Sequence, residues 1–302
     1  MEPLVTDSPS IRVAAAQMEC ATGDLETNLQ TCLAMVAEAS RREADMVVFP
    51  ELALTGAKLE GRVLEVARRL DSWELSTIAK ASGDINVIVG FVEEGRDGRI
   101  YNSAVCFENG HPVYVHRKLY LVSYGSLNEG RLFAPGAAID AFATRLGRLG
   151  LCICEDVWHS PLPYLAAMDG AEILVTSAGS PEGLVSSSAT SRELWSAVLR
   201  AHAVMLNCFH VFANRAGRED DLVYWGGSMI WGPGGELLAE ASSAEPALVV
   251  ADMDLVKIRD QRFLTPFLRD ERIELTLREL SRIGRQRLMR DASDRKQVDE
   301  MS

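Results

Sequence analysis

Long apolar runs and an excess of basic charge are both missing from this 302-residue chain. No apolar segment approaches the roughly 18 residues that a membrane-spanning helix requires, which argues against an integral membrane protein. Lys and Arg number 31 against 43 Asp and Glu, so the formal net charge is −12. Because nucleic acids and anionic membranes select for clusters of Lys and Arg, we expect neither as a partner.

Metal, nucleotide and disulfide patterns are also absent. The five histidines lack ligand spacing, and neither a Cys-x-x-Cys pair nor a P-loop occurs, so we expect no metal and no cofactor. The six cysteines are scattered rather than arranged as in a small disulfide scaffold. The opening MEPLVTDSPS has acid and proline where a signal peptide has basic charge and then apolar residues. These absences together predict a cytoplasmic protein with free thiols.

What the chain does contain is an alternation of strand-like and helix-like segments, which indicates an α/β layer structure. Hairpins over 99–115 and 224–240 make a purely parallel sheet unexpected, so we predict a mixed sheet with helices on one face. The hydrophobic patterns predict strands at 11–18, 46–49, 86–92, 149–154, 172–176, 209–213 and 247–253, and helices at 24–42, 73–81, 162–168 and 192–206.

The predicted domain organisation is simple, because no repeat or linker-like composition interrupts the alternation. We expect one domain over residues 11–268, preceded by an extension over residues 1–10. A charged helical tail is expected over residues 269–302.

Cys154 ends the apolar segment that begins at Leu149 and is followed at once by Glu155. At such a strand-to-turn junction, side chains are exposed at the sheet edge and backbone N–H groups point outward, which favours a reactive thiolate and an oxyanion hole. Cys152 would lie on the same face of the strand. Both thiols could be core residues, or Cys152 could be the buried one and Cys154 the exposed one.

Glu51 and Lys118 each follow a predicted strand. Glu51 comes after the apolar segment 46–49 through a proline, and a carboxylate near a crevice there can have its pKa raised into the range of a useful base. Lys118 lies in a basic segment after 113–115. Taken singly, each residue would be interpreted as a solvated surface group.

Taken together, the segments around these three residues resemble the nitrilase superfamily of carbon–nitrogen hydrolases in order and spacing. The resemblance covers about residues 11–255. The matching segments are Phe49-Pro50-Glu51, Arg117-Lys118-Leu119-Tyr120-Leu121, Ile153-Cys154-Glu155-Asp156, Asn102-Ser103, the stretch 128–136, Ser177-Ala178, Asn214-Arg215-Ala216-Gly217, Gly227-Ser228 and Pro233-Gly234-Gly235.

The resemblance implies covalent catalysis by a base-activated thiol. Glu51 would take the proton of Cys154, and the thiolate would attack an amide or nitrile carbon. Lys118 and the backbone N–H of Glu155 would hold the negative charge that develops, while Glu129 would orient Lys118 or the substrate. Water activated by Glu51 would then hydrolyse the thioester.

The resemblance also implies a fold, the four-layer αββα sandwich of two mixed sheets, which covers the second sheet face. Subunits of this family commonly pair, so a homodimer or larger homo-oligomer is expected by analogy. The other expected partner is a small-molecule amide or nitrile substrate. Tyr124, Trp158, Ser177 and Gly179 are the candidate substrate contacts, although both aromatic residues could equally belong to the core.

Within the family, Cys154-Glu155-Asp156-Val157-Trp158 and the Tyr124-Gly125 step look most like the glutaminase domain of glutamine-dependent NAD synthetases. The ATP-using synthetase domain is missing from the 302 residues. Those glutaminases carry a basic residue soon after a Ser-Ala-Ser-Pro step, whereas the next one here after Pro181 is Arg192. A carboxylate without a cation is costly to desolvate, so a neutral or apolar amide is expected.

Two other functions remain open at this stage. A nitrilase uses the same triad and differs only in how the tetrahedral intermediate collapses. A catalytically silent scaffold or binding subunit would keep the fold after losing activity. All three triad positions are occupied, which favours an enzyme.

Overall fold

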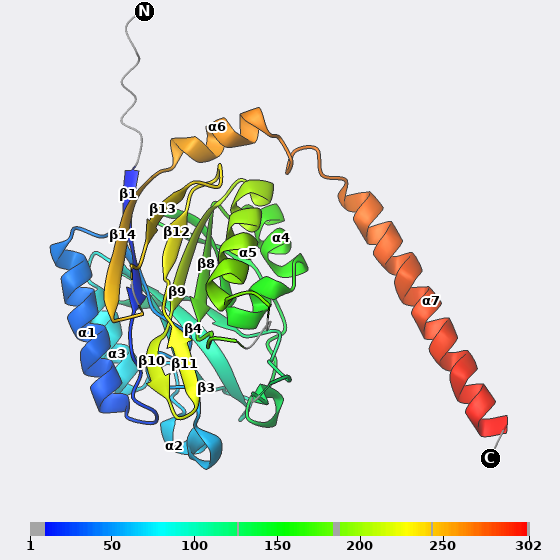
Figure 1. The fold of residues 1–302 in the computed structure, drawn as a ribbon, viewed down its shortest axis with the longest axis horizontal. Helices are drawn as coiled ribbons and strands as arrows, with labels where there is room; N and C mark the ends of the chain where they lie inside the picture. Colours follow the sequence, from blue (N-terminus) through cyan, green and yellow to red (C-terminus); the bar gives the residue numbers. More distant parts are fainter. Residues whose placement is uncertain (1–9, 126, 184–187, 243, 301–302) are drawn as a thin grey trace, which may run out of the picture.

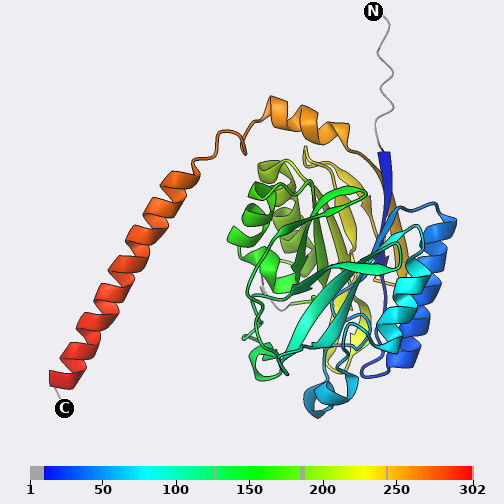
Figure 2. The ribbon, with the colours of Figure 1, turned by 180° about the vertical axis from the view of Figure 1, so that it is seen from behind.

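The computed structural model describes residues 10–300 apart from 126, 184–187 and 243. Two six-stranded mixed sheets pack face to face, and helices cover the outer side of each (Figures 1 and 2). The predicted four-layer αββα sandwich is therefore confirmed. Residues 1–9 of the predicted N-terminal extension lie outside the described residues.

The first sheet has the order β14-β1-β2-β3-β4-β5. β1 pairs in parallel with β2 and antiparallel with β14, so the first and last strands of the sandwich lie side by side. The predicted hairpin is β4–β5, and its turn residues Asn109 and Gly110 both have positive φ, as a type I′ turn requires. The strands are β1 (Ser10–Gln17), β2 (Met46–Val48), β3 (Asn86–Glu94), β4 (Ile100–Glu108), β5 (His111–Arg117) and β14 (Ala247–Asp254).

The second sheet has the order β13-β12-β9-β8-β7-β6. Its centre, β7-β8-β9, is parallel, and antiparallel strands flank it on both sides. The strands are β6 (Ala141–Thr144), β7 (Gly147–Ile153), β8 (Ile173–Ala178), β9 (Phe209–Asn214), β12 (Met229–Trp231) and β13 (Leu237–Glu240).

Three short strands were not predicted from the sequence. One is β6, and the other two form a separate hairpin, β10 (Ala216–Glu219) with β11 (Leu222–Trp225). Each has four residues, too few for an alternating pattern to stand out. The hairpin leaves the end of β9 and forms part of the candidate site described below.

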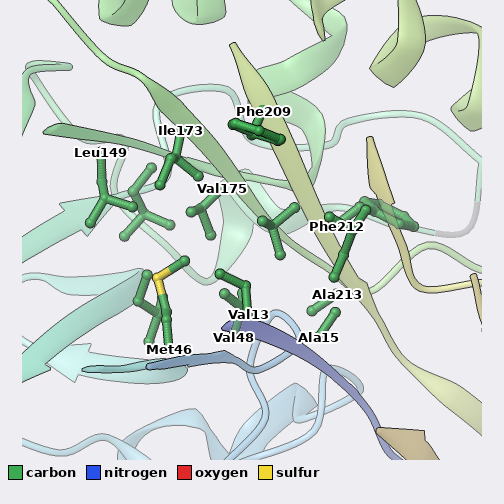
Figure 3. Close-up of a cluster of buried hydrophobic side chains, with 14 of the residues drawn as sticks. Val13, Ala15, Met46, Val48, Leu149, Ile173, Val175, Phe209, Phe212 and Ala213 are labelled. Carbon is green, nitrogen blue, oxygen red and sulfur yellow. The ribbon is translucent and has the colours of Figure 1, made fainter. Parts of the chain in front are cut away.

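The core between the sheets follows from the two-residue period of the strands (Figure 3). Val13 and Ala15 of β1 point between the sheets, where they meet side chains such as Val175 and Phe209 of the second sheet. Ala14, between them in sequence, faces the opposite side and packs beneath the helices. Because both faces of these strands are buried, they read as continuous apolar runs.

Helices form the outer layers, and capping residues fix where the longer ones begin. The helices α1 (Leu25–Arg41) and α3 (Trp73–Ser82) cover the first sheet, while α4 (Pro161–Met168) and α5 (Ser191–Leu206) cover the second (Figures 1 and 2). Asp24 caps α1 by accepting a 3.0 Å hydrogen bond from the Thr27 N–H. Thr190 and Glu193 form a capping box at α5. A short helix, α2 (Val63–Val66), lies in the connection before α3.

The chain after β14 continues into α6 (Val256–Leu264), which was not predicted, and α7 (Ile273–Glu300), the predicted C-terminal helix. Figure 1 shows α7 extending away from the sandwich. The apolar residues Ile273, Leu277 and Leu280 of this helix are exposed. Two expectations stay predictions. They are the domain bounds, 11–268 and 269–302, and the assembly into a homo-oligomer. None of the helices in the described part of the chain combines the length and apolar character needed to cross a membrane.

Candidate active site

The three predicted catalytic residues come from two sheets. Glu51 follows β2 and Lys118 follows β5, two strands of the first sheet that run in the same direction. Cys154 follows β7 of the second sheet. The backbone N–H of Glu51 donates a 3.3 Å hydrogen bond to the carbonyl of Ala178, directly across the sandwich. Packing of the two sheets therefore brings the three side chains together.

Lys118 lies between two carboxylates. Its Nζ is 2.7 Å from Glu51 Oε1, 2.9 Å from Glu129 Oε1 and 2.8 Å from Glu129 Oε2. Glu129 belongs to the 3₁₀ helix η2 (Glu129–Arg131) and also accepts a 2.8 Å bond from the Val122 N–H. The side chains of Lys118 and Glu51 are almost completely buried. A buried cation thus lies between two acids, Glu51 and Glu129.

Glu51 is oriented by two further donors. Asn102 on β4 donates through Nδ2 to Glu51 Oε1 at 2.8 Å, and the Gly179 N–H donates to Glu51 Oε2 at 3.0 Å. The tight turn that carries Glu51 lies against Gly90 of β3, where a Cβ atom would come within 2.6 Å of the Pro50 carbonyl oxygen. With Lys118, these contacts leave the carboxylate a single orientation.

Charges around Lys118 set its protonation. Burial by itself would lower the pKa of Lys118, but the carboxylates of Glu129 and Glu51 outweigh it and hold that pKa well above its ordinary value. Burial raises the pKa of Glu129, Lys118 opposes this rise and Glu51 adds to it. Lys118 is therefore a permanent cation, available to a negative charge that forms beside it.

Cys154 begins the 3₁₀ helix η3 (Cys154–Trp158) with a φ of +43°, which is strained for a residue with a side chain. Its side chain is 8% exposed and faces a cavity, whereas Cys152 packs in the core between the sheets. Burial raises the pKa of the Cys154 thiol well above its ordinary value, Glu51 raises it further and Lys118 lowers it. The thiol is therefore protonated at neutral pH and needs a base.

Asp156, buried two residues after Cys154, joins the two halves of the site. Its Oδ1 accepts from the N–H groups of Leu119 and Tyr120 at 3.0 and 2.9 Å, just after Lys118. Its Oδ2 accepts from the Ile153 N–H at 3.0 Å and lies 2.8 Å from His116 Nε2. One carboxylate thus fixes the lysine segment to the turn that carries the thiol, a role that the sequence analysis missed.

A cavity of about 690 Å³ opens on these residues, a volume typical of small-molecule sites. Of the four candidate substrate contacts, Tyr124, Trp158 and Gly179 line this cavity, whereas Ser177 is fully buried in β8 and does not. The lining residues are Glu51, Leu52, Ala57, Lys58, Leu59, Gly61, Lys118, Val122, Tyr124, Leu127, Asn128, Glu129, Arg131, Leu132, Phe133, Cys154, Glu155, Trp158, Gly179, Ser180, Pro181, Trp195 and Tyr224.

The cavity wall carries two cations, Lys58 and Arg131, that the sequence analysis did not place there. The sequence-based expectation concerned only the segment after Pro181, where the next basic residue, Arg192, pairs with Glu240. The premise that no cation is near the substrate is therefore wrong. Lys58 and Arg131 lie far from that segment in sequence, so only the fold brings them to the cavity.

A buried cluster around Glu219 supports this wall. Glu219 Oε1 accepts from the N–H groups of Ala57 and Lys58 at 3.0 and 3.2 Å. Its Oε2 accepts from Arg215 Nη1 and from the Tyr224 hydroxyl, both at 2.9 Å. The β10–β11 hairpin is thereby tied to the loop at 57–58. Within the described residues, no group of three or more His, Cys, Asp and Glu side chains is arranged to hold a metal ion.

Comparison with known proteins relates this geometry to a family. The family model described as Carbon-nitrogen hydrolase matches residues 12–263. An (R)-stereoselective amidase from a Pseudomonas species is 31% identical over 271 residues, which cover 88% of this chain and 93% of the amidase. A glutamine-dependent NAD(+) synthetase from Thermotoga maritima is 29% identical over 252 residues, 81% of this chain. The match covers only 42% of that synthetase, so this chain spans less than half its length.

Solved structures give the same relationship. The crystal structure of a carbon–nitrogen hydrolase from Helicobacter pylori G27 superposes with a TM-score of 0.79 at 26% identity. The superposition covers 90% of this chain and 99% of the other. The family model matches most of the sequence, and the solved structure has the same sandwich fold, so sequence and structure indicate the same family. This chain belongs to the carbon–nitrogen hydrolase family.

Proposed function

We propose that this protein is an amidase, which hydrolyses a small-molecule amide to a carboxylate and ammonia through a thioester on Cys154. The observation that carries the proposal is the meeting of Cys154, Glu51 and Lys118 in one cavity, with Lys118 Nζ 2.7 Å from Glu51 Oε1. The likeness to the Pseudomonas amidase supports the same class of reaction.

The first half of the reaction forms the thioester. Glu51 takes the Cys154 proton, and the sulfur attacks the carbonyl carbon of the amide. Negative charge moves to the substrate oxygen, where Lys118 stabilises it. The Glu155 N–H is a second donor, because N–H groups in the first turn of a helix have no acceptor within it. Glu51 then passes its proton to the nitrogen, and ammonia leaves.

The second half returns the enzyme to its starting state. Glu51 takes a proton from water, and the resulting hydroxide attacks the thioester carbon. The tetrahedral intermediate collapses, the carbon–sulfur bond breaks, and Cys154 recovers its proton. One amide and one water thus become one carboxylic acid and one ammonia. Glu129 keeps Lys118 charged and oriented throughout.

The proposal is tested by ammonia release from a panel of amides, carbamoyl amines and nitriles, with Cys154→Ala in parallel. We expect release from at least one amide and no release by the variant. Release from nitriles alone would indicate a nitrilase. No release from any compound, together with a Cys154 that iodoacetamide does not alkylate, would contradict the proposal and favour a silent scaffold.

We also predict that Asp156→Asn lowers kcat about a hundredfold, because small displacements of reacting groups have effects of this size. The amide nitrogen of Asn cannot accept from the Ile153 N–H, so the turn at Cys154 shifts relative to Lys118. Steady-state kinetics and urea unfolding check this, and we expect a stability loss of about 1–3 kcal/mol. Asp71→Asn, at an exposed loop position, is the matched control. Equal kcat values for both variants would exclude this role.

A further inference from the structure

We infer that the substrate is an amide with a carboxylate at the end remote from the scissile bond, and that Arg131 binds this carboxylate. The inference deepens the proposed function and rests on it. It comes from the charged and apolar side chains that line the cavity together with the reacting groups, and from the chemistry of guanidinium recognition.

The other charged groups that line the cavity already have ion-pair or hydrogen-bond partners. Lys118 is shared by Glu51 and Glu129, as described above. Lys58 forms an ion pair with Asp221 of the turn between β10 and β11. Glu155 accepts a 2.7 Å hydrogen bond from the Tyr124 hydroxyl and lies 3.6 Å from His159 Nε2. A ligand would have to compete with these partners to use any of them.

Arg131 differs from the rest. It lines the cavity, is exposed, and its guanidinium has no ion pair or hydrogen bond with any side chain or carbonyl in the described part of the protein. Arg131 is therefore the cation, among the described lining residues, whose charged group is free to bind a ligand. The chain as a whole has a formal net charge of −12, so a local cation is what an anionic substrate needs here.

The position of Arg131 suits the far end of a substrate. It is the last residue of η2, whose first residue, Glu129, contacts Lys118. Val122, Leu132 and Phe133 also line the cavity. An amide bound at Cys154 would thus find apolar side chains for its chain and the Arg131 guanidinium for its distal group within one cavity.

Guanidinium chemistry selects among the possible distal groups. The planar fork of donors binds a carboxylate through two parallel charge-assisted hydrogen bonds. A distal ammonium would meet a like charge, and a neutral alkyl end would leave the guanidinium without a partner. The class that fits is the monoamide of a dicarboxylic acid, or a related amide with a terminal carboxylate.

The test compares three substrate series of increasing chain length in the wild-type protein. The first is the monoamides of succinic, glutaric and adipic acids, the second is the matching neutral alkyl amides, and the third is the matching ω-amino amides. We expect kcat/KM for the best carboxylate member to exceed its neutral counterpart about tenfold or more, and the ω-amino series to be the poorest.

Arg131→Gln then removes the guanidinium. We expect the preference for the carboxylate series to fall about tenfold to a hundredfold, the range for hydrogen bonds between charged groups, through KM rather than kcat. The kcat/KM of the neutral amides should fall by a smaller factor than that of the carboxylate series. Arg192→Gln removes an exposed arginine that pairs outside the cavity and is the matched control. Arg131→Lys should recover part of the preference.

The outcomes separate the inference from the proposed function. Wild-type protein that hydrolyses neutral or ω-amino amides at least as well as the carboxylate series would overturn the inference but leave the amidase intact. An Arg131→Gln variant that loses both series equally would also overturn it. Failure to hydrolyse any amide would reject the proposed function itself. The wild-type comparison requires no variant, so misfolding cannot obscure it.

Discussion

Glu51→Gln is expected to lower kcat about a thousandfold and, at the same time, to lower the pKa of the Cys154 thiol. The loss of turnover follows because general-base catalysis contributes about 10²–10⁴ in rate. The direction of the pKa change follows from charge. The Glu51 carboxylate disfavours the Cys154 thiolate and Lys118 favours it, so removing the Glu51 charge lowers the pKa of the thiol. The variant should thus have a more acidic nucleophile and be a poorer enzyme.

Thiolate absorbance measured against pH, with Cys154→Ala as the background for the other cysteines, gives the thiol pKa. Glu129→Gln is the informative comparison, since Glu129 also raises the pKa of the Cys154 thiol. Glu129→Gln should lower the pKa of the Cys154 thiol but keeps Glu51 as the base. Its kcat should therefore fall less than that of Glu51→Gln. If Glu51→Gln left kcat within tenfold of the wild-type value, another group would have to be the base.

Lys118→Met is expected to lower kcat about 10²–10³-fold, the usual effect of removing one oxyanion donor. It should also destabilise the protein by about 3–5 kcal/mol, because the carboxylates of Glu51 and Glu129 would remain buried without their cation. The pKa of the Cys154 thiol should rise, since Lys118 lowers it in the wild-type protein. Steady-state kinetics and urea unfolding measure the first two effects.

A double variant separates the structural role of Lys118 from its catalytic role. Adding Glu129→Gln to Lys118→Met removes one of the two unpaired carboxylates, so part of the stability should return. Turnover should stay low, because no cation faces the substrate oxygen. Recovery of turnover together with stability would mean that Lys118 acts only by holding the fold.

Much of the sandwich could be predicted from the sequence, because its strands are buried on both faces and its long helices have clear caps. The apolar runs of β1 and β7 and the capping residue Asp24 are local features that can be recognised without knowing the neighbours. The strands β6, β10 and β11 are short and gain their stability from pairing and packing. The alternation of apolar and polar residues within these strands is too short to identify them from the sequence.

The candidate site divides in the same way. Cys154, Glu51 and Lys118 could be proposed from the sequence because each follows a strand and together they have the order and spacing of a known family. Asp156 contacts the segment after Lys118, and Arg131 shares a cavity with Cys154, only because the fold brings together segments distant in sequence, which no local pattern reports. Ser177 shows the opposite failure, because its position after Thr176 looked like a strand end, yet β8 continues through Ala178 and buries it.

The division of the site between the two sheets also makes the chemistry a reporter of folding. Neither sheet carries the complete set of groups, since Glu51 and Lys118 belong to one and Cys154 to the other. A chain that has formed both sheets but not yet docked them would have native-like secondary structure and no competent site. During refolding, the rate at which activity returns would therefore report the rate at which the two sheets dock. Circular dichroism of the backbone does not detect this step.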